Sequence, residues 1–411
     1  MINLPHNLCY GCSGCLNICP KDAITMKEDE FGYRFPTIDL DKCIDCSLCE
    51  KVCPELNTYE LSEPKSVLAA VCKDTYDHKT SASGGFATVL SRYIIEQGGV
   101  VYGCSEKNYK NIRHIRVDRI EDVDLLKRSK YVHSSIEHTY REALSDLKNG
   151  RQVLFVGTPC QISGLKGFLR KSYENLITVD VVCHGVPNMR MLAYDVENNP
   201  NFKGVDPDKV FVDFRWKSRY GIRFGIRFGI DGEVVSECVQ PYDAYMYAFN
   251  QGISYRENCH RCPYAKKERI GDITVADFWG IKEIEDSKFK NSTGVSLLLI
   301  NTKKGQEIFK QVADRFETEL RTFEEAARRN ANLSHPSNRP SNKDEFLQLW
   351  NRVGLHEALI KCDPSYKRAQ NPIVKFCSTP FIKKLVTIIR KTPLLNQVVT
   401  KIYRILTHYN G

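Results

Sequence analysis

Eight cysteines near the start of the chain have the spacing of ligands to two iron–sulfur clusters. They form two runs that each read C-x2-C-x2-C-x3-C-P, at Cys9, Cys12, Cys15 and Cys19 and again at Cys43, Cys46, Cys49 and Cys53. In such a pair of runs, the first three thiolates of each run bind one [4Fe-4S] cubane, and the fourth thiolate of that run binds the other cubane. We therefore expect one cluster on Cys9, Cys12, Cys15 and Cys53, and a second on Cys43, Cys46, Cys49 and Cys19.

Zinc is the alternative ion for cysteines at this spacing. A structural zinc site closes with four ligands from two C-x2-C pairs, whereas each run here adds a third cysteine at the same step and a Cys-Pro. Zinc is the less favoured interpretation. Residues 1–58 therefore resemble a bacterial two-cluster ferredoxin domain, in which 23–26 and 33–36 are expected to form a hairpin between the cluster halves.

The composition excludes several classes of protein. At 411 residues the chain is too long for one compact domain, and a hydrophobic share of 42% suffices for real cores. Met1 to Pro5 leads straight into the first cysteine run, so we expect no secretory signal, and no apolar run of about eighteen residues could span a membrane. The odd count of 17 cysteines argues for thiolates kept reduced rather than disulfides. We therefore expect a cytoplasmic protein.

The net charge of +9 is unevenly spread along the chain. Residues 1–60 carry ten acids against five bases, whereas residues 361–411 carry ten bases against one acid. A negative ferredoxin end suits docking to a basic redox partner protein, and a positive tail suits an anionic surface, although either end could be an ordinary solvated face. No nucleic-acid-binding motif accompanies the basic excess, so no nucleic-acid partner is expected.

The residues after a polar linker at 54–65 predict an α/β body. Apolar runs at 67–72, 100–103, 152–156 and 176–182 indicate buried strands, and strands that alternate with helices imply a parallel sheet covered on both faces. Residues 211–228 predict an antiparallel pair with Asp231-Gly232 as its turn, and 295–301 a final apolar strand. The fold class is thus a multidomain α+β and α/β protein with a mixed sheet. Its expected domains are 1–58, 62–150, 151–305 and a helical, basic extension at 306–411.

Two segments of the body could hold an anionic ligand. Ser83-Gly84-Gly85 begins a helix that runs on from Phe86, and backbone N–H groups at such a helix start can bind an anion. The alternative is an ordinary N-cap with a tight turn. The segment Ser129-Lys130-Tyr131 could hold phosphates and stack on a ring, or be a solvated loop.

Four later cysteines could form a third site. Cys160 and Cys183 each follow a predicted buried strand, and the carboxyl ends of such strands border the ligand crevice of an α/β sheet. Cys259 and Cys262 add a C-x2-C pair, which makes four thiolates, the number that a third [4Fe-4S] cluster needs. The alternative is that Cys160 and Cys183 are buried apolar cysteines of the usual kind.

The last hundred residues show apolar stripes at helical spacing beside basic faces. The stripes run through 381–389 and 394–406, and Pro393 divides the tail into two helices. We expect these helices to pack on the parent domain. Peripheral membrane contact is the alternative.

Several motifs in this order resemble those of the coenzyme F-420 hydrogenase/dehydrogenase family, in its beta subunits. They are Gly157-Thr158-Pro159-Cys160-Gln161, Cys183-His184-Gly185, Cys259-x2-Cys262 and Ala276-Asp277-Phe278-Trp279-Gly280, behind the ferredoxin runs. The resemblance covers roughly residues 1–305 and implies an iron–sulfur flavoprotein with FAD. By motif, it also implies that Ser83-Gly84-Gly85 and Ser129-Lys130-Tyr131 bind the flavin, beside a third cluster on Cys160, Cys183, Cys259 and Cys262.

A two-electron cofactor is also what the clusters require. Cubanes move one electron at a time whereas organic substrates exchange two, so a flavin between them is expected. Near a small organic substrate or a deazaflavin we place His184, Lys217 and Asp277. Two alternatives remain: a non-catalytic electron-transfer subunit of a larger redox complex, and an anion- or nucleic-acid-binding protein with structural clusters.

Overall fold

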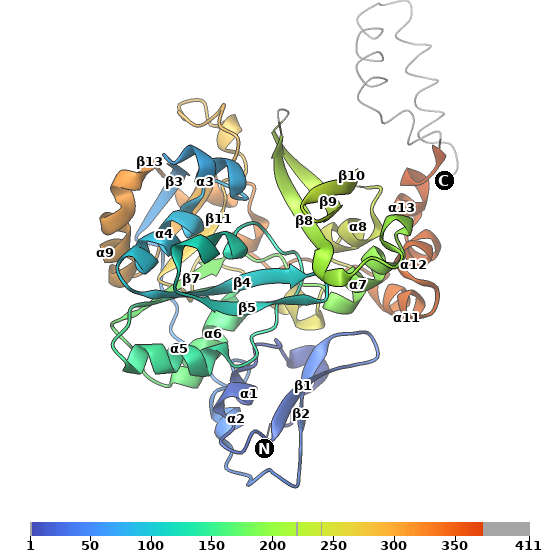
Figure 1. The fold of residues 1–411 in the computed structure, drawn as a ribbon, viewed down its shortest axis with the longest axis horizontal. Coiled ribbons are helices and arrows are strands. Elements are labelled where there is room, and N and C mark those ends of the chain that lie inside the picture. The colour runs from blue at the N-terminus through green and yellow to red at the C-terminus, as the bar shows by residue number, and fades with distance from the viewer. Residues whose placement is uncertain (1, 219–220, 240, 373–411) are drawn as a thin grey trace, which may run out of the picture.

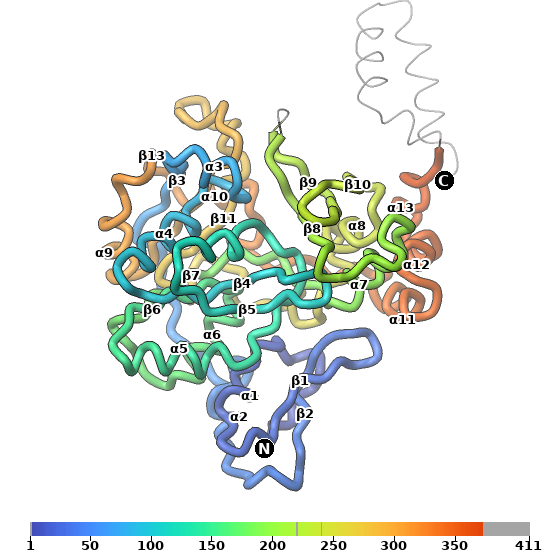
Figure 2. The backbone as a smooth tube through the Cα atoms, in the orientation of Figure 1, coloured from blue at the N-terminus to red at the C-terminus, as the bar shows by residue number. Residues whose placement is uncertain are grey.

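The computed structural model describes residues 2–218, 221–239 and 241–372 (Figure 1). An N-terminal domain lies beside a larger α/β body, and a second lobe packs against both (Figure 2). The N-terminal domain contains α1 (Gly14–Ile18), α2 (Leu48–Lys51) and the hairpin of β1 (Ile24–Glu28) and β2 (Arg34–Ile38). The two strands pair antiparallel, which confirms the predicted hairpin.

An eight-stranded mixed sheet forms the centre of the body, in the order β13-β3-β12-β11-β7-β6-β4-β5. Its strands are β3 (Ser66–Cys72), β4 (Val100–Asn108), β5 (Asn111–Val117), β6 (Val153–Gly157), β7 (Leu176–Val181), β11 (Ile273–Asp277), β12 (Ser296–Ile300) and β13 (Phe316–Arg321). Strands β4, β6, β7 and β11 are parallel neighbours. The remaining neighbours are antiparallel. The parallel sheet expected from the apolar runs is therefore confined to the centre.

Helices cover both faces of this sheet, because its apolar strands leave side chains to bury on either side. Residues of α4 (Phe86–Glu96) and α9 (Lys303–Val312) share one apolar core with the sheet. Residues of α5 (Thr139–Lys148) and α6 (Pro159–Leu169) share another. The short helices α3 (Thr75–Thr80) and α10 (Phe323–Ala327) lie at the β3/β13 end of the sheet (Figure 2).

A second lobe is built around a three-stranded antiparallel sheet of β8 (Val210–Ser218), β9 (Gly221–Ile230) and β10 (Glu233–Val239). The helices that share its apolar core are α7 (Met189–Glu197), α8 (Ala244–Asn250), α11 (Lys343–Val353), α12 (Leu355–Cys362) and α13 (Pro364–Ala369). The predicted β8–β9 pair is present, but Asp231-Gly232 joins β9 to β10, a strand that the sequence did not suggest. Both turn residues have positive φ, 49° and 88°, as a tight hairpin turn requires.

The expectation that 306–411 is helical needs one correction. Residues 316–321 form β13, which pairs antiparallel with the edge strand β3, because β3 offers an unpaired backbone edge that the chain returns to cover. The predicted helices at 381–389 and 394–406 lie outside the described residues. Within the described residues, no helix is both long and apolar enough to cross a membrane.

Candidate redox centres and cofactor cavity

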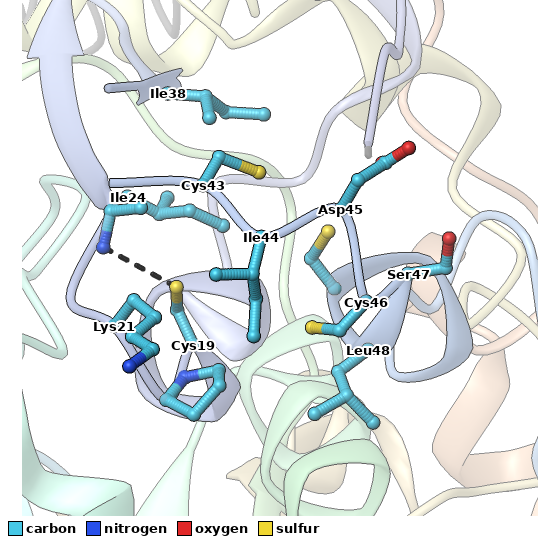
Figure 3. A pocket seen from close by; sticks show the side chains of 13 residues that line it. Cys19, Lys21, Ile24, Ile38, Cys43, Ile44, Asp45, Cys46, Ser47 and Leu48 are labelled. Atoms are coloured by element: carbon cyan, nitrogen blue, oxygen red, sulfur yellow. Dashed lines mark hydrogen bonds between the residues drawn. The ribbon is translucent and has the colours of Figure 1, made fainter. Parts of the chain in front are cut away.

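Four cysteines of the N-terminal domain line one small pocket beside α1, β1 and α2. This distal set is Cys19, Cys43, Cys46 and Cys49. The sulfur atoms of Cys19, Cys43 and Cys46 turn toward the same space (Figure 3). The backbone N–H of Ala23 donates to Cys19 Sγ, and that of Ile2 to Cys49 Sγ, each at 3.3 Å. Backbone N–H donors of this kind stabilise thiolates. The pocket therefore fits a cluster that is held by the fourth cysteine of the first run and the first three cysteines of the second run.

The other four cysteines of the domain also lie together. This proximal set is Cys9, Cys12, Cys15 and Cys53. Burial, followed by the neighbouring thiols Cys15, Cys53 and Cys9, raises the pKa of Cys12 well above its usual value. The backbone N–H of Gly11 donates to Cys9 Sγ at 3.4 Å. In both sets the fourth cysteine of one run thus lies with the first three cysteines of the other run, as a two-cluster ferredoxin requires.

The two runs share one local backbone conformation. Each enters its short helix through a serine in the left-handed region, with φ of 61° at Ser13 and 55° at Ser47. Each serine directly follows the second cysteine of its run. The turn at this point folds the run back on itself, so that three thiols of one run can face one centre.

A third set of thiols lies in the body. Cys160 stands in the first turn of α6, Cys183 closely follows β7, and Cys259 and Cys262 belong to the turn that follows Arg256. Burial and then the thiols of Cys259, Cys160 and Cys262 raise the pKa of Cys183 well above its usual value. Burial and then Cys160 raise the pKa of Cys262 to about 12. Each pKa depends on the other thiols because all four lie close together.

None of these sets is arranged around a single point. Among the described residues, no three His, Cys, Asp or Glu side chains are grouped closely enough to hold one metal ion. All twelve cysteines are free thiols rather than disulfides. A [4Fe-4S] cluster takes its four thiolates at four separate irons, so the ligands of a cluster need not converge on one point.

The proximal and third sets meet across the contact between α1 and α6. A Cβ added to Gly164 of α6 would lie 2.9 Å from both Cβ and Sγ of Cys12, so the thiol sits directly against the helix backbone. Cys160 lies one turn earlier on the same helix. The Tyr140 hydroxyl lies within hydrogen-bond distance of Cys12 O at 3.0 Å and of Gln161 O at 2.7 Å. One buried helix turn therefore separates the two thiol sets.

A cavity of about 490 Å³ lies at the carboxyl ends of β6, β7 and β11 and at the start of α4. This is the edge of the sheet where the strand order predicts the ligand crevice. The volume falls within the range of ligand and cofactor sites, and most of the wall is apolar with a few charged groups. Cys183 belongs both to this wall and to the third set.

Five of the six residues expected to bind the flavin line this cavity: Ser83, Gly85, Ser129, Lys130 and Tyr131. Gly84 does not. Its N–H donates to Ser296 Oγ at 3.0 Å, and an added Cβ would lie 2.1 Å from Ala70 O, so it packs against β3 and β12. Gly85 has φ of 90° and precedes α4, whose first N–H groups therefore begin at the cavity wall.

The residues expected near the substrate have different surroundings. His184 and Asp277 line the cavity, and burial lowers the pKa of His184 below its usual value. Asp277 forms an ion pair with Arg215. Lys217 is not among the lining residues: its ammonium donates to the carbonyl oxygens of His78 and Ser83, behind the Ser-Gly-Gly turn. Burial lowers the pKa of Lys217 to about 8.

Sequence reasoning missed Arg215 as a residue of this site. It lies on β8 of the second lobe, reaches the cavity, and its guanidinium stands 4.9 Å from the ring centre of Phe224 and 5.1 Å from that of Trp279. No local pattern could have found it, because its partners belong to β9, to the end of β11 and to the residues that follow it. Its position shows that the second lobe completes the cavity.

Two families match the chain. Residues 150–326 match the C terminus of the beta subunit of coenzyme F420 hydrogenase/dehydrogenase, and residues 8–56 match the 4Fe-4S dicluster domain. Both agree with the resemblance predicted from the cysteine runs and the later motifs.

Named relatives cover different shares of the chain. One of the subunits of the F(420)H(2) dehydrogenase of Methanosarcina mazei is 22% identical over 329 residues, which is 76% of this chain and 85% of that protein. The coenzyme F420-dependent sulfite reductase of Methanocaldococcus jannaschii is 25% identical over 167 residues, which is 39% of this chain and 25% of that protein. Among solved structures, a chain of the F420-reducing [NiFe] hydrogenase complex from Methanosarcina barkeri superposes with a TM-score of 0.44 at 19% identity, over 63% of this chain and 83% of that one.

Proposed function

Because residues 150–326 carry the C-terminal domain of coenzyme F420 hydrogenase/dehydrogenase beta subunits and residues 8–56 a 4Fe-4S dicluster domain, we propose that this chain is an iron–sulfur flavoprotein oxidoreductase. It passes electrons between clusters on the distal, proximal and third sets and FAD, and exchanges a hydride with an organic substrate or a deazaflavin-like coenzyme. The observation that carries this proposal is the position of Cys183, which is shared by the third set and the cavity wall.

The residues that line the cavity suit a flavin dinucleotide. The N–H groups at the start of α4 and the ammonium of Lys130 suit its phosphates, and Tyr131, which stacks on Phe249 with 4.6 Å between ring centres, offers an aromatic wall. When bound, a flavin supplies the two-electron step, since it takes up a hydride and releases two electrons singly and a proton to solvent.

Within this proposal the three expected substrate residues have separate tasks. His184 borders the cavity beside Cys183 and is held neutral by burial, so it can accept or donate one hydrogen bond at the reacting end. Asp277 fixes Arg215 at the cavity through their ion pair. Lys217 holds the Ser83 turn by its bonds to backbone oxygens and so positions the start of α4.

The relatives also support a place in a larger redox assembly. The protein from Methanosarcina mazei is named as one of the subunits of a dehydrogenase, and this chain covers 85% of it. We infer that this chain likewise exchanges electrons with a partner protein as well as with a small substrate.

Anaerobic purification followed by iron, sulfide and flavin analysis tests the proposal. The unmodified chain should contain about twelve irons, four for each set of four cysteines, together with one FAD. Replacing Cys259 and Cys262 together by Ser should remove about four irons and leave about eight. The matched double variant Cys238→Ser with Cys362→Ser, outside all three sets, should retain every iron.

Two results would contradict separate parts of the proposal. About eight irons in the unmodified chain would dismiss the third cluster. A preparation with full clusters that binds no flavin, even after incubation with FAD, would leave an electron-transfer protein whose partner performs the chemistry.

A further inference from the structure

A buried guanidinium lies where the N-terminal domain meets the body. The side chain of Arg256 is only 1% exposed. Its Nε donates to Cys9 O at 2.7 Å, its Nη2 donates to Arg34 O at 2.9 Å, and its Cζ lies 4.1 Å from the ring centre of Phe35. Arg256 therefore reaches from the body into the proximal half of the N-terminal domain.

The same residue belongs to the backbone of the third set. Its carbonyl accepts from the N–H of Cys259 at 3.0 Å, and its own N–H donates to Val186 O at 2.9 Å, three residues beyond Cys183. The positive charge of Arg256 also lowers the pKa of the Cys160 and Cys259 thiols, against the larger effect of burial. Its charge thus acts on the third set, while its hydrogen bonds reach Cys9 and Arg34 of the N-terminal domain.

No carboxylate neutralises this cation within the described part of the chain. Arg256 forms no ion pair there, and its bonds go to carbonyl oxygens. Its Nη1 is buried without a hydrogen-bond partner. That nitrogen would lie 3.2 Å from a Cβ added to Gly11, the residue whose N–H donates to Cys9 Sγ. A buried cation without a counter-ion is costly unless a negative group stands nearby.

We propose that Arg256 is a positioning residue for electron transfer, whose fixed charge stabilises the reduced and more negative forms of the clusters on the proximal and third sets. This inference rests on the proposed function. One electron added to a cluster adds one negative charge, and a buried cation close to it favours that state. Arg256 thus raises both reduction potentials relative to the cluster of the distal set.

Redox titrations of the holoprotein followed by electron paramagnetic resonance test this. In Arg256→Gln, the ratio of reduced to oxidised proximal cluster at a fixed potential should fall by about three- to thirtyfold. The cluster of the distal set should keep its potential. The shift should persist in high salt because a buried charge is screened little. Arg256→Lys keeps the positive charge, so the potential of its proximal cluster should stay close to that of the unmodified protein.

A matched control comes from Arg141, another cation at the domain contact. Its guanidinium donates to the carbonyl oxygens of Asn17 and Cys19, but its side chain is 34% exposed. Arg141→Gln should therefore leave the proximal potential unchanged, because solvent screens its charge.

The outcomes separate this inference from the proposed function. Unchanged proximal and third-cluster potentials in an iron-replete Arg256→Gln would overturn it. If Arg256→Gln loses iron, Arg256→Lys is the deciding variant. Retention of iron and of the cluster potentials in Arg256→Lys supports the role of the charge. Loss of iron in both variants shows that only the hydrogen bonds of Arg256 matter and contradicts the inference. A wild-type count of about eight irons would remove the third cluster, yet the shift on the proximal cluster could still be measured.

Discussion

Two neighbouring carboxyl groups lie in the second lobe: Asp195 of α7, which is half-buried, and Asp243, the buried N-cap of α8. Burial and then the neighbouring Asp243 raise the pKa of Asp195 well above its usual value, and burial raises that of Asp243 to about 6. Asp243 also accepts from the N–H of Met246 at 2.7 Å. Because two such groups cannot both ionise easily at close range, the pair should hold a proton at neutral pH.

This pair predicts a pH dependence of stability. The folded state binds the shared proton more tightly than the unfolded state does, so the stabilising contribution of the pair is complete below about pH 4 and falls as the pH rises. The loss continues above about pH 6, where Asp243 titrates, because the pKa of Asp195 is also raised well above its usual value. Asp195→Asn keeps a hydrogen bond to Asp243 without the need for a proton. At pH 8 it should stabilise the protein by on the order of 2 kcal/mol, and by less at pH 5.5.

Thermal unfolding of the anaerobic holoprotein at both pH values is the measurement. Asp208→Asn, at an exposed carboxylate whose pKa is lowered mainly by its hydrogen bond to Lys107, serves as the control and should not raise the midpoint at pH 8. A lower midpoint for Asp195→Asn than for the unmodified chain at pH 8 would refute the shared proton.

At the scale of elements, the contact between α1 and α6 sets how near the proximal thiols come to the third set. Glycines face each other there, since a Cβ on Gly14 would lie 3.3 Å from Gly164 O and one on Gly164 would lie 2.9 Å from Cys12 Sγ. Tyr140 closes the same contact by bonding to both segments. The close approach therefore depends on the absence of a methyl group.

Gly164→Ala should separate the two elements. A Gly to Ala change inside a helix usually stabilises by about 0.5–1 kcal/mol, but here the methyl group must displace the Cys12 thiol. We expect a lower unfolding midpoint, loss of up to about four irons, and weaker magnetic coupling between the reduced proximal and third clusters.

Gly103→Ala is the comparison for this change. A Cβ at Gly103 meets nothing closer than 3.4 Å, an ordinary contact with Leu126, so every iron should remain. A Gly164→Ala protein with full iron, unchanged magnetic coupling and a raised unfolding midpoint would show that the contact between α1 and α6 can accommodate a methyl group.

At the scale of the whole molecule, the distal set forms the exposed end of the N-terminal domain. Cys46 is exposed, and near it Leu40 and Ile44 are 68% and 57% exposed. Residues 1–60 carry ten acids against five bases. Exposed apolar side chains with surrounding acids suit brief contact with a basic electron carrier.

Electron exchange with a basic one-electron acceptor protein should therefore slow as salt is added, because the Debye length falls to about 10 Å at 0.1 M. Asp41→Lys should lower the rate at low salt by about two- to fivefold. Glu357→Lys, the same charge change at an exposed position of α12, should have little effect. Stopped-flow measurements with a neutral small-molecule acceptor supply the reference. Equal salt dependence for both acceptors would argue against an acidic docking face.

Local spacing was enough to predict the parts of this protein that depend on near neighbours. The cysteine runs, the hairpin between them, the strand at 67–72 and the helix from Phe86 all follow from patterns a few residues long, and the family domain followed from short motifs. The β9–β10 turn at Asp231-Gly232 was recognised as a turn but assigned to the wrong strands, because a turn signal does not identify its partners. The strand at 316–321 was missed, because its pairing with β3 is a tertiary contact.

The sequence alone determined which thiolates are present and in what local register, because a C-x2-C-x2-C run needs only one turn of backbone to present its ligands. The tertiary structure decided that Cys160, Cys183, Cys259 and Cys262 meet at all, since three separate elements carry them to one place. It also decided that Arg215 reaches the cavity, that Gly164 admits Cys12, and that Arg256 is buried between two thiol sets. Those contacts join residues far apart in the chain, and only packing determines which distant side chains share a low-dielectric interior.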